Sequence, residues 1–139
     1  MASDSIRGGC LCGATRYVVR GTPHVVAFCH CSMCRRSAGA PVTAWAMFDA
    51  DNFEFEKGEP HTYTSSPGVQ RRFCPRCGTQ LIFMADFLPG LVDVTVGSMD
   101  EPDALPPQMH IWDSRRIAWV QLSTDLPRHQ ELPLKEDKS

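Results

Sequence analysis

The spacing of seven cysteines is the feature that most constrains what this chain can fold into. They lie in three short motifs: Cys10-Leu-Cys12, Cys29-His-Cys31-Ser-Met-Cys34 and Cys74-Pro-Arg-Cys77. An odd number of cysteines cannot all pair in disulfides, and cysteines separated by one or two residues are typical of metal ligands. The first residues carry no apolar segment like that of a signal peptide. We therefore expect a cytoplasmic protein, in which cysteines are more often metal ligands or reactive thiols than disulfides.

The length and net charge of the chain indicate one domain and limit the kinds of molecule that it is expected to bind. The chain has 139 residues, the usual size of one domain. Its 14 basic and 16 acidic residues give a net charge of -2, and no run of 18 apolar residues occurs. We therefore expect no binding to nucleic acid and no membrane association. Eleven of the basic residues are arginine, which makes bidentate contacts with carboxylates and phosphates. The composition is thus compatible with a small anionic ligand.

Apolar and polar residues alternate along most of the chain, as they do in half-buried strands. The alternation predicts strands at 16–20, 25–28, 42–48, 52–56, 61–64, 70–74, 80–84, 91–97 and 108–112. Segment 42–48 is apolar on both faces, which predicts a central strand. One short helix is expected over Ser32–Ala38. Short strands separated by turn residues predict a single all-β domain, a sandwich or tent-like arrangement. We place this domain at residues 1–125 and a polar, frayed tail at 126–139.

Four of the cysteines can be grouped into one closed metal site. Cys74-Pro-Arg-Cys77 is a knuckle in which Pro75 fixes φ for the turn and Gly78 permits the left-handed backbone that follows. A knuckle supplies two thiolates, and structural zinc takes four ligands. Cys10 and Cys12 are the obvious second pair. The alternatives are a redox-active Cys-x-x-Cys pair and two buried structural thiols at positions 10 and 12.

The other three cysteines, Cys29, Cys31 and Cys34, have no eighth cysteine to complete a site. Three protein ligands and one open position are the arrangement of catalytic zinc. His30 is an awkward fourth ligand, because in an extended segment its side chain points away from those of its neighbours. Two alternatives are an iron–sulfur cluster and a structural zinc that a histidine closes. The histidines available for the latter are His24, His61, His110 and His129.

Arginines accompany both groups of cysteines. Arg35 and Arg36 follow the triplet directly, and Arg71, Arg72 and Arg76 flank the knuckle. Such cations would offset the charge of buried thiolates and could also bind an anionic ligand.

The chain resembles the family of glutathione-dependent formaldehyde-activating enzymes, which also includes centromere protein V. The resemblance covers Gly9 to about Arg128 and rests on GGCLCGATRY, FCHCSMCRRSAGAP, FCPRCGTQL, VGSMDEPD, MHIW and the stretch Trp119-Val-Gln-Leu. It implies an all-β, tent-like zinc fold of short antiparallel strands and two zinc ions. The structural zinc ligands of the family fall on Cys10, Cys12, Cys74 and Cys77, and its catalytic-type zinc falls on Cys29, Cys31 and Cys34.

The resemblance also implies an activity. It indicates a zinc-dependent carbon–sulfur lyase-type enzyme that forms or cleaves an adduct of a small thiol and a small aldehyde, such as S-hydroxymethylglutathione. Metal coordination deprotonates a thiol, and a site with three thiolates suits a thiol better than water as its fourth ligand. Arg35 and Arg72 are candidates for contacts with the glutathione carboxylates. The alternatives are a non-catalytic zinc-binding module and a thiol or metal sensor.

Overall fold

The fold is described by a computed structural model for residues 5–133. Within this range it has ten strands, one seven-residue α-helix and four short 3-10 turns. The elements are β1 (Ser5–Gly9), β2 (Arg16–Arg20), β3 (Val25–Cys29), α1 (Ser32–Ala38), β4 (Thr43–Asp49), β5 (Phe53–Lys57), β6 (His61–Ser66), β7 (Val69–Phe73), β8 (Gln80–Ala85), β9 (Leu91–Thr95) and β10 (Met109–Ile111). The prediction of an all-β domain with one short helix is confirmed.

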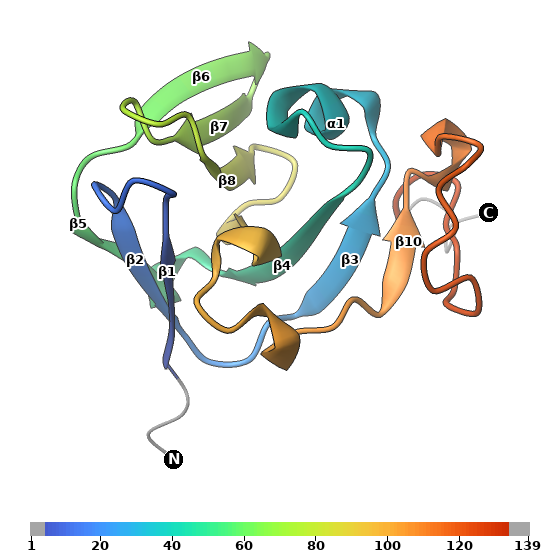
Figure 1. Cartoon of the computed structure of the whole chain (residues 1–139), viewed down its shortest axis with the longest axis horizontal. Coiled ribbons are helices and arrows are strands. Elements are labelled where there is room, and N and C mark those ends of the chain that lie inside the picture. The colour runs from blue at the N-terminus through green and yellow to red at the C-terminus, as the bar shows by residue number, and fades with distance from the viewer. Residues whose placement is uncertain (1–4, 134–139) are drawn as a thin grey trace.

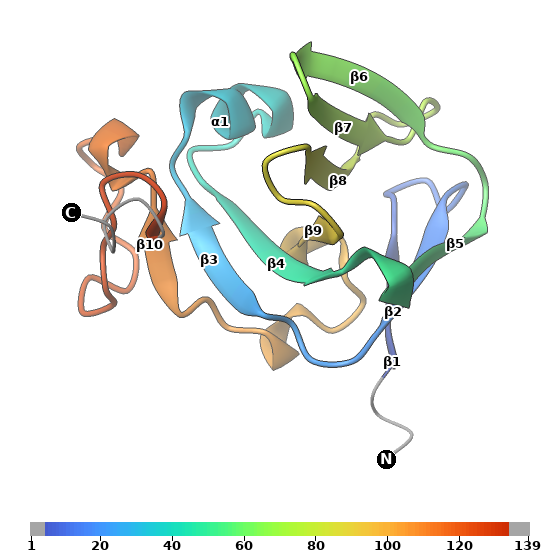
Figure 2. The ribbon, with the colours of Figure 1, turned by 180° about the vertical axis from the view of Figure 1, so that it is seen from behind.

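The strands form two sheets (Figures 1 and 2). The small sheet has the order β1-β2-β5, and the large sheet has the order β10-β3-β4-β9-β8-β7-β6. Neighbouring strands are antiparallel with one exception, because β10 pairs with β3 in parallel. This exception departs from the expectation of antiparallel strands throughout. Parallel strands need a long connection between them, and the chain between β3 and β10 is long enough to supply it.

The main core lies between the small sheet and one face of the large sheet. Tyr17 and Val19 of β2 meet Phe48 of β4 and Val94 of β9, all of which are buried. Gly8 of β1 has no room for a side chain, because a Cβ atom there would collide with the Tyr17 hydroxyl and the Ser98 carbonyl oxygen. Strand β1 escaped the sequence analysis for this reason: glycine occupies positions where an alternating strand would carry apolar side chains.

Strand β4 is buried on both of its faces, as its apolar sequence predicted. Ala46 and Phe48 face the main core, whereas Trp45 lies on the other face in a second cluster with Cys29 and Cys34. Helix α1 connects β3 to β4 at this end of the sheet (Figure 1). The second cluster thus places the predicted cysteine triplet against the centre of the large sheet.

The part of the predicted tail that the structure describes, residues 126–133, runs beside β10. The backbone N–H of His110 donates to the Pro127 carbonyl at 2.8 Å, and that of His129 donates to the His110 carbonyl at 2.8 Å. These bonds form a bridge alongside the β10 edge. The domain boundary at residue 125 stays a prediction. Within residues 5–133, no helix has the length and apolar character needed to cross a membrane.

A pair of phenylalanines tests where the core lies. Phe48 is 1% exposed and Phe87 is 59% exposed. Phe48→Ala should lower the free energy of unfolding by about 3–5 kcal/mol, because it leaves a cavity in the main core. Phe87→Ala should change it by less than about 1 kcal/mol. Urea unfolding of both variants checks this, and equal losses would contradict the placement of the core.

Candidate metal centres

Cys10, Cys12, Cys74 and Cys77 come together, as their spacing predicted. Their four sulfur atoms lie within 4.8 Å of one another, with Cys10 and Cys12 3.7 Å apart and Cys12 and Cys74 3.9 Å apart. These distances are too long for disulfides, and all seven cysteines are free. A tetrahedral zinc ion with zinc–sulfur bonds of about 2.3 Å places its ligands about 3.8 Å apart. The four sulfurs therefore fit a closed tetrahedral metal site.

The backbone of two loops positions these four sulfurs. The N–H groups of Arg76 and Cys77 donate to Cys74 Sγ at 3.3 and 3.4 Å. The N–H of Thr15 donates to Cys10 Sγ at 3.2 Å. Gly78 has the left-handed φ of 83° that the knuckle requires. Such N–H donors stabilise negative charge on sulfur, so this group suits thiolates.

The triplet forms where β3 ends and α1 begins. Cys29 is the last residue of β3, Cys31 caps α1 and Cys34 lies within the helix. Cys29 Sγ and Cys34 Sγ are 3.6 Å apart, and all three sulfurs lie within 4.8 Å of one another. In the described part of the chain, no histidine or carboxylate completes this group. The three sulfurs thus suit three corners of a tetrahedral site.

Arg71 is the arginine that reaches the triplet. Its side chain is buried, its Nη1 lies 3.6 Å from Cys34 Sγ, and its Nε donates to Ser65 Oγ at 3.2 Å. Its guanidinium also lies 5.0 Å from the centroid of the Phe83 ring. Among residues 5–133, no carboxylate is within ion-pair distance of Arg71. A buried cation requires a negative partner, so the triplet supplies it.

The thiol groups perturb one another. Hydrogen bonds from the Cys29 and Cys34 thiols lower the pKa of Cys31 to about 2. The pKa of Cys29 is raised by its hydrogen bonds to Cys31 and Cys34 and by burial. The lowered pKa favours the thiolate form of Cys31, whose side chain is partly exposed.

Apolar rings line the triplet. Trp45 and Phe83 pack with their ring centroids 5.9 Å apart, and Ile111 and Trp112 pack against the same cluster. These side chains restrict water around the sulfur atoms. A cleft of about 520 Å³ lies between the end of α1 and the four-cysteine group, with walls that include Ser37 of α1, Thr43 of β4, Cys10 and Cys77.

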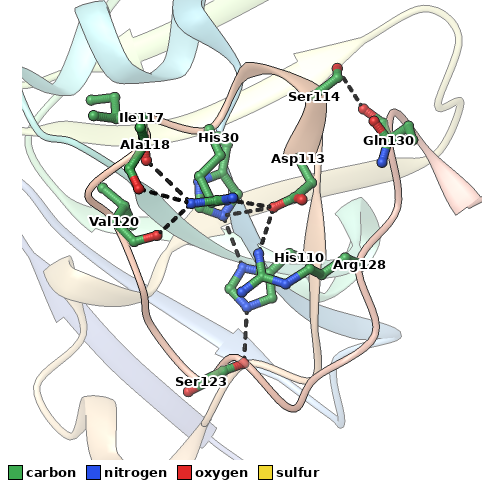
Figure 3. A network of polar contacts seen from close by, with 11 residues as sticks. His30, His110, Asp113, Ser114, Ile117, Ala118, Val120, Ser123, Arg128 and Gln130 are labelled. Atoms are coloured by element: carbon green, nitrogen blue, oxygen red, sulfur yellow. Dashed lines mark hydrogen bonds and ion pairs between the residues drawn. The ribbon is translucent and has the colours of Figure 1, made fainter.

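A buried polar network includes His30, the residue between Cys29 and Cys31 (Figure 3). His30 Nε2 and His110 Nδ1 are 2.9 Å apart, and both side chains are fully buried. Burial and the neighbouring His110 lower the pKa of His30 to about 4, so His30 is neutral. Asp113 lies beside this pair, with its Oδ1 2.8 Å from Arg128 Nη1.

Sequence reasoning grouped the cysteines correctly but overlooked several neighbours. Arg71 was considered only as a cation beside the knuckle, because its contact with Cys34 depends on the register of β7 and β8. Successive residues of a strand point to opposite faces, so Arg72 leaves β7 on the side away from Arg71. Contacts of Arg35 and Arg72 with a ligand stay a prediction. His110 and Asp113 carried no local signal, since the network joins segments about 80 residues apart.

Comparison with known proteins identifies the family. The family model described as glutathione-dependent formaldehyde-activating enzyme matches residues 5–115. The chain belongs to this family. It is also 32% identical over 130 residues to a protein from Halomonas elongata that has been given the provisional name of glutathione-dependent formaldehyde-activating enzyme. That match covers 86% of this chain and 82% of the relative.

A solved structure supports the fold of the family member. The crystal structure of a Rhodobacter sphaeroides protein superposes with a TM-score of 0.55 at 17% identity. The superposition covers 88% of this chain and 98% of the other. Two sheets with few helices are therefore the common architecture.

The two cysteine groups should differ in their effect on stability. The four-cysteine group joins positions as much as 67 residues apart, from Cys10 to Cys77, whereas the triplet spans only six residues. In zinc-containing, reducing buffer, Cys74→Ser should lower the free energy of unfolding by roughly 2–5 kcal/mol, as when a cross-link across a long loop is lost. Cys31→Ser should lower it by less than about 1 kcal/mol. Urea unfolding that gives the reverse order would exchange the roles of the two groups.

Proposed function

We propose that this family member is a zinc-dependent carbon–sulfur lyase-type enzyme. It forms or cleaves the adduct of a small thiol and a small aldehyde, with S-hydroxymethylglutathione as the representative adduct. The observation that carries this proposal is the cysteine triplet, in which three sulfurs converge with no fourth protein ligand among the described residues. Family membership supplies the substrate class. We place the reaction in the cytoplasm.

The proposal assigns two zinc ions. Cys10, Cys12, Cys74 and Cys77 hold the structural ion, and Cys29, Cys31 and Cys34 hold the catalytic-type ion. The sulfur distances of both groups support this assignment. Zinc at the triplet keeps a bound thiol in its thiolate form, which is the nucleophilic form.

The reaction needs little beyond a thiolate and correct placement. Sulfur bonds to the aldehyde carbon, and the proton released by the thiol ends on the aldehyde oxygen. The reverse reaction breaks the same carbon–sulfur bond. Arg71 offsets the accumulated thiolate charge, and the rings of Trp45, Phe83 and Trp112 limit water near the sulfurs. Placement of two reactants in one site lowers the entropic barrier to the reaction.

The body of the thiol would occupy the neighbouring cleft. Thr43 is paired with Cys29 on adjacent strands, and opposed side chains of an antiparallel pair are about 5 Å apart. Ser37 lies one helical turn beyond Cys34. The cleft bounded by these two residues therefore begins close to the triplet. Arg35, on the same helix as Ser37, is the proposed partner of a glutathione carboxylate.

A thiol or metal sensor is the alternative function. The half-exposed Cys31, whose pKa is low, favours this reading because a thiolate is the species that oxidises. A sensor should lose one zinc ion on mild oxidation, and a non-catalytic zinc module should bind no small thiol at the triplet. Elemental analysis after mild oxidation, and a thiol-binding titration, distinguish these two readings from the enzyme.

The activity itself can be measured by exchange. Two-dimensional exchange NMR on a mixture of glutathione, formaldehyde and their adduct should show exchange that accelerates in proportion to the wild-type protein. Cys31→Ser should remain folded and lose this acceleration, because the triplet no longer holds the thiol. Elemental analysis should first show two zinc ions per wild-type chain. Exchange at the uncatalysed rate with fully loaded wild-type protein would rule out the formaldehyde assignment.

The arginine assignment has a separate test. Arg35→Gln should raise KM for glutathione about 5- to 50-fold, the effect of losing one charge-assisted contact, with little change in kcat. Arg36→Gln is the matched control, because Arg36 is a more exposed neighbour on the same helix. If both variants have the KM of the wild type, other groups bind the carboxylates.

A further inference from the structure

The buried histidine pair is connected to the backbone by hydrogen bonds. His110 Nε2 lies 3.2 Å from the Ser123 carbonyl oxygen, which can only accept, so this nitrogen donates. His30 Nε2 and His110 Nδ1 share a second hydrogen bond across 2.9 Å. The two bonds thus connect His30 through His110 to the backbone of Ser123 (Figure 3).

Asp113 completes this network without making it a cation site. His30, His110 and Asp113 bring three ligand-type atoms within 4.8 Å of one another. However, Asp113 Oδ1 already pairs with Arg128 Nη1 at 2.8 Å and with Arg116 Nε at 3.5 Å. Two guanidinium groups compensate the carboxylate and repel a further cation. The network is therefore a set of protein–protein hydrogen bonds and ion pairs.

Strained backbone lies at both ends of the network. Among residues 5–133, Trp112 with φ of 54° and Ser123 with φ of 43° are the two non-glycine residues in the left-handed region. Ser123 supplies the carbonyl that His110 bonds, and Trp112 precedes Asp113. Left-handed backbone is costly for residues with a side chain and persists only where its surroundings enforce it. Hydrogen bonds of residues 112–114 to the segment 129–131 provide this enforcement at Trp112.

The network is coupled directly to the cysteine triplet. His30 stands between Cys29 and Cys31, and its backbone N–H donates to the Ile111 carbonyl at 3.1 Å. Ile111 and Trp112 pack against the cluster that contains Cys29 and Cys34. The network therefore holds the triplet segment through His30, and it holds the apolar residues Ile111 and Trp112 that pack against the cysteines.

We propose that His110 is a positioning residue for the metal site of the triplet. It holds His30, and with it the sulfurs of Cys29 and Cys31, in the arrangement that binds the ion. Asp113 with its two arginines holds Trp112 as a wall of the same site. This inference rests on the part of the proposed function that assigns a metal to the triplet, and it is independent of the aldehyde and the thiol.

Zinc release tests the proposal without using enzyme activity. Excess chelating indicator should remove zinc from the wild-type protein in two phases, of which Cys31→Ser lacks the fast one. His110→Ala should accelerate the fast phase about 10- to 100-fold, the usual effect of removing a group that orients metal ligands, and leave the slow phase unchanged. His110→Gln, whose side chain offers an NH2 donor and a carbonyl acceptor, should restore much of the wild-type rate. In protein substituted with cobalt(II), His110→Ala should alter the thiolate-to-cobalt absorption bands of the triplet and leave those of the four-cysteine group unchanged.

A control separates positioning from general destabilisation. Val92→Ala trims a buried side chain in the main core, on the face of the sheet away from the triplet, and should leave both phases as in the wild type. A fast phase that is unchanged in His110→Ala, or that Val92→Ala accelerates equally, would overturn the proposal. If His110→Ala does not fold, Arg128→Ala carries the test at a partly exposed position, and an unchanged fast phase again overturns it.

The outcome is distinguishable from failure of the proposed function. Two release phases with a His110 effect but no acceleration of exchange would support positioning and refute the enzyme. A single zinc ion in the wild-type protein would refute the metal assignment of the triplet and this inference with it.

Discussion

Strand β4 packs against the main core on one face and against the cysteine triplet on the other, and the rest of the structure depends on this double burial. Its even-numbered residues complete the main core with the small sheet, while Trp45 packs on Cys29 and Cys34. A strand buried on both faces cannot shift its register without moving apolar residues out of one environment and polar groups into the other. The pairing of β3 and β4 therefore fixes where the triplet stands relative to the sheet.

Charge is the second constraint, and it links the cysteines to the arginine-rich composition. With one zinc ion bound at each group, as we propose, the four-cysteine group carries a net charge of -2 and the triplet carries -1. The larger negative charge is placed at loops, where backbone N–H groups of residues 15, 76 and 77 face the sulfurs. The triplet is more enclosed, and a buried guanidinium from β7 compensates it. The two groups thus compensate negative charge on sulfur with different donors, backbone N–H groups in one and a guanidinium in the other.

Local features were predictable from sequence, and contacts between distant segments were not. The spacing of the cysteines grouped them correctly, because residues one to three positions apart are neighbours in any conformation. The strands with clear alternation and helix Ser32–Ala38 were found for the same local reason. Strand β1 was missed, since Gly8 and Gly9 interrupt its alternation. Arg71 and the His30–His110 pair needed the pairing of strands far apart in the chain, which no local pattern encodes. The parallel pairing of β10 with β3 belongs to the same class.

That parallel pairing has a consequence for the order in which the protein is completed during synthesis. The cysteines of the triplet leave the ribosome early, yet the residues that support them from behind lie at positions 110–131. Contacts between such distant segments form late, since the chain between them must first be closed into a loop. All four cysteines of the four-cysteine group lie within the first 77 residues, so this group can assemble before residues 110–131 are made. A chain that ends before residue 110 would therefore carry the four-cysteine group complete but lack the support for the triplet.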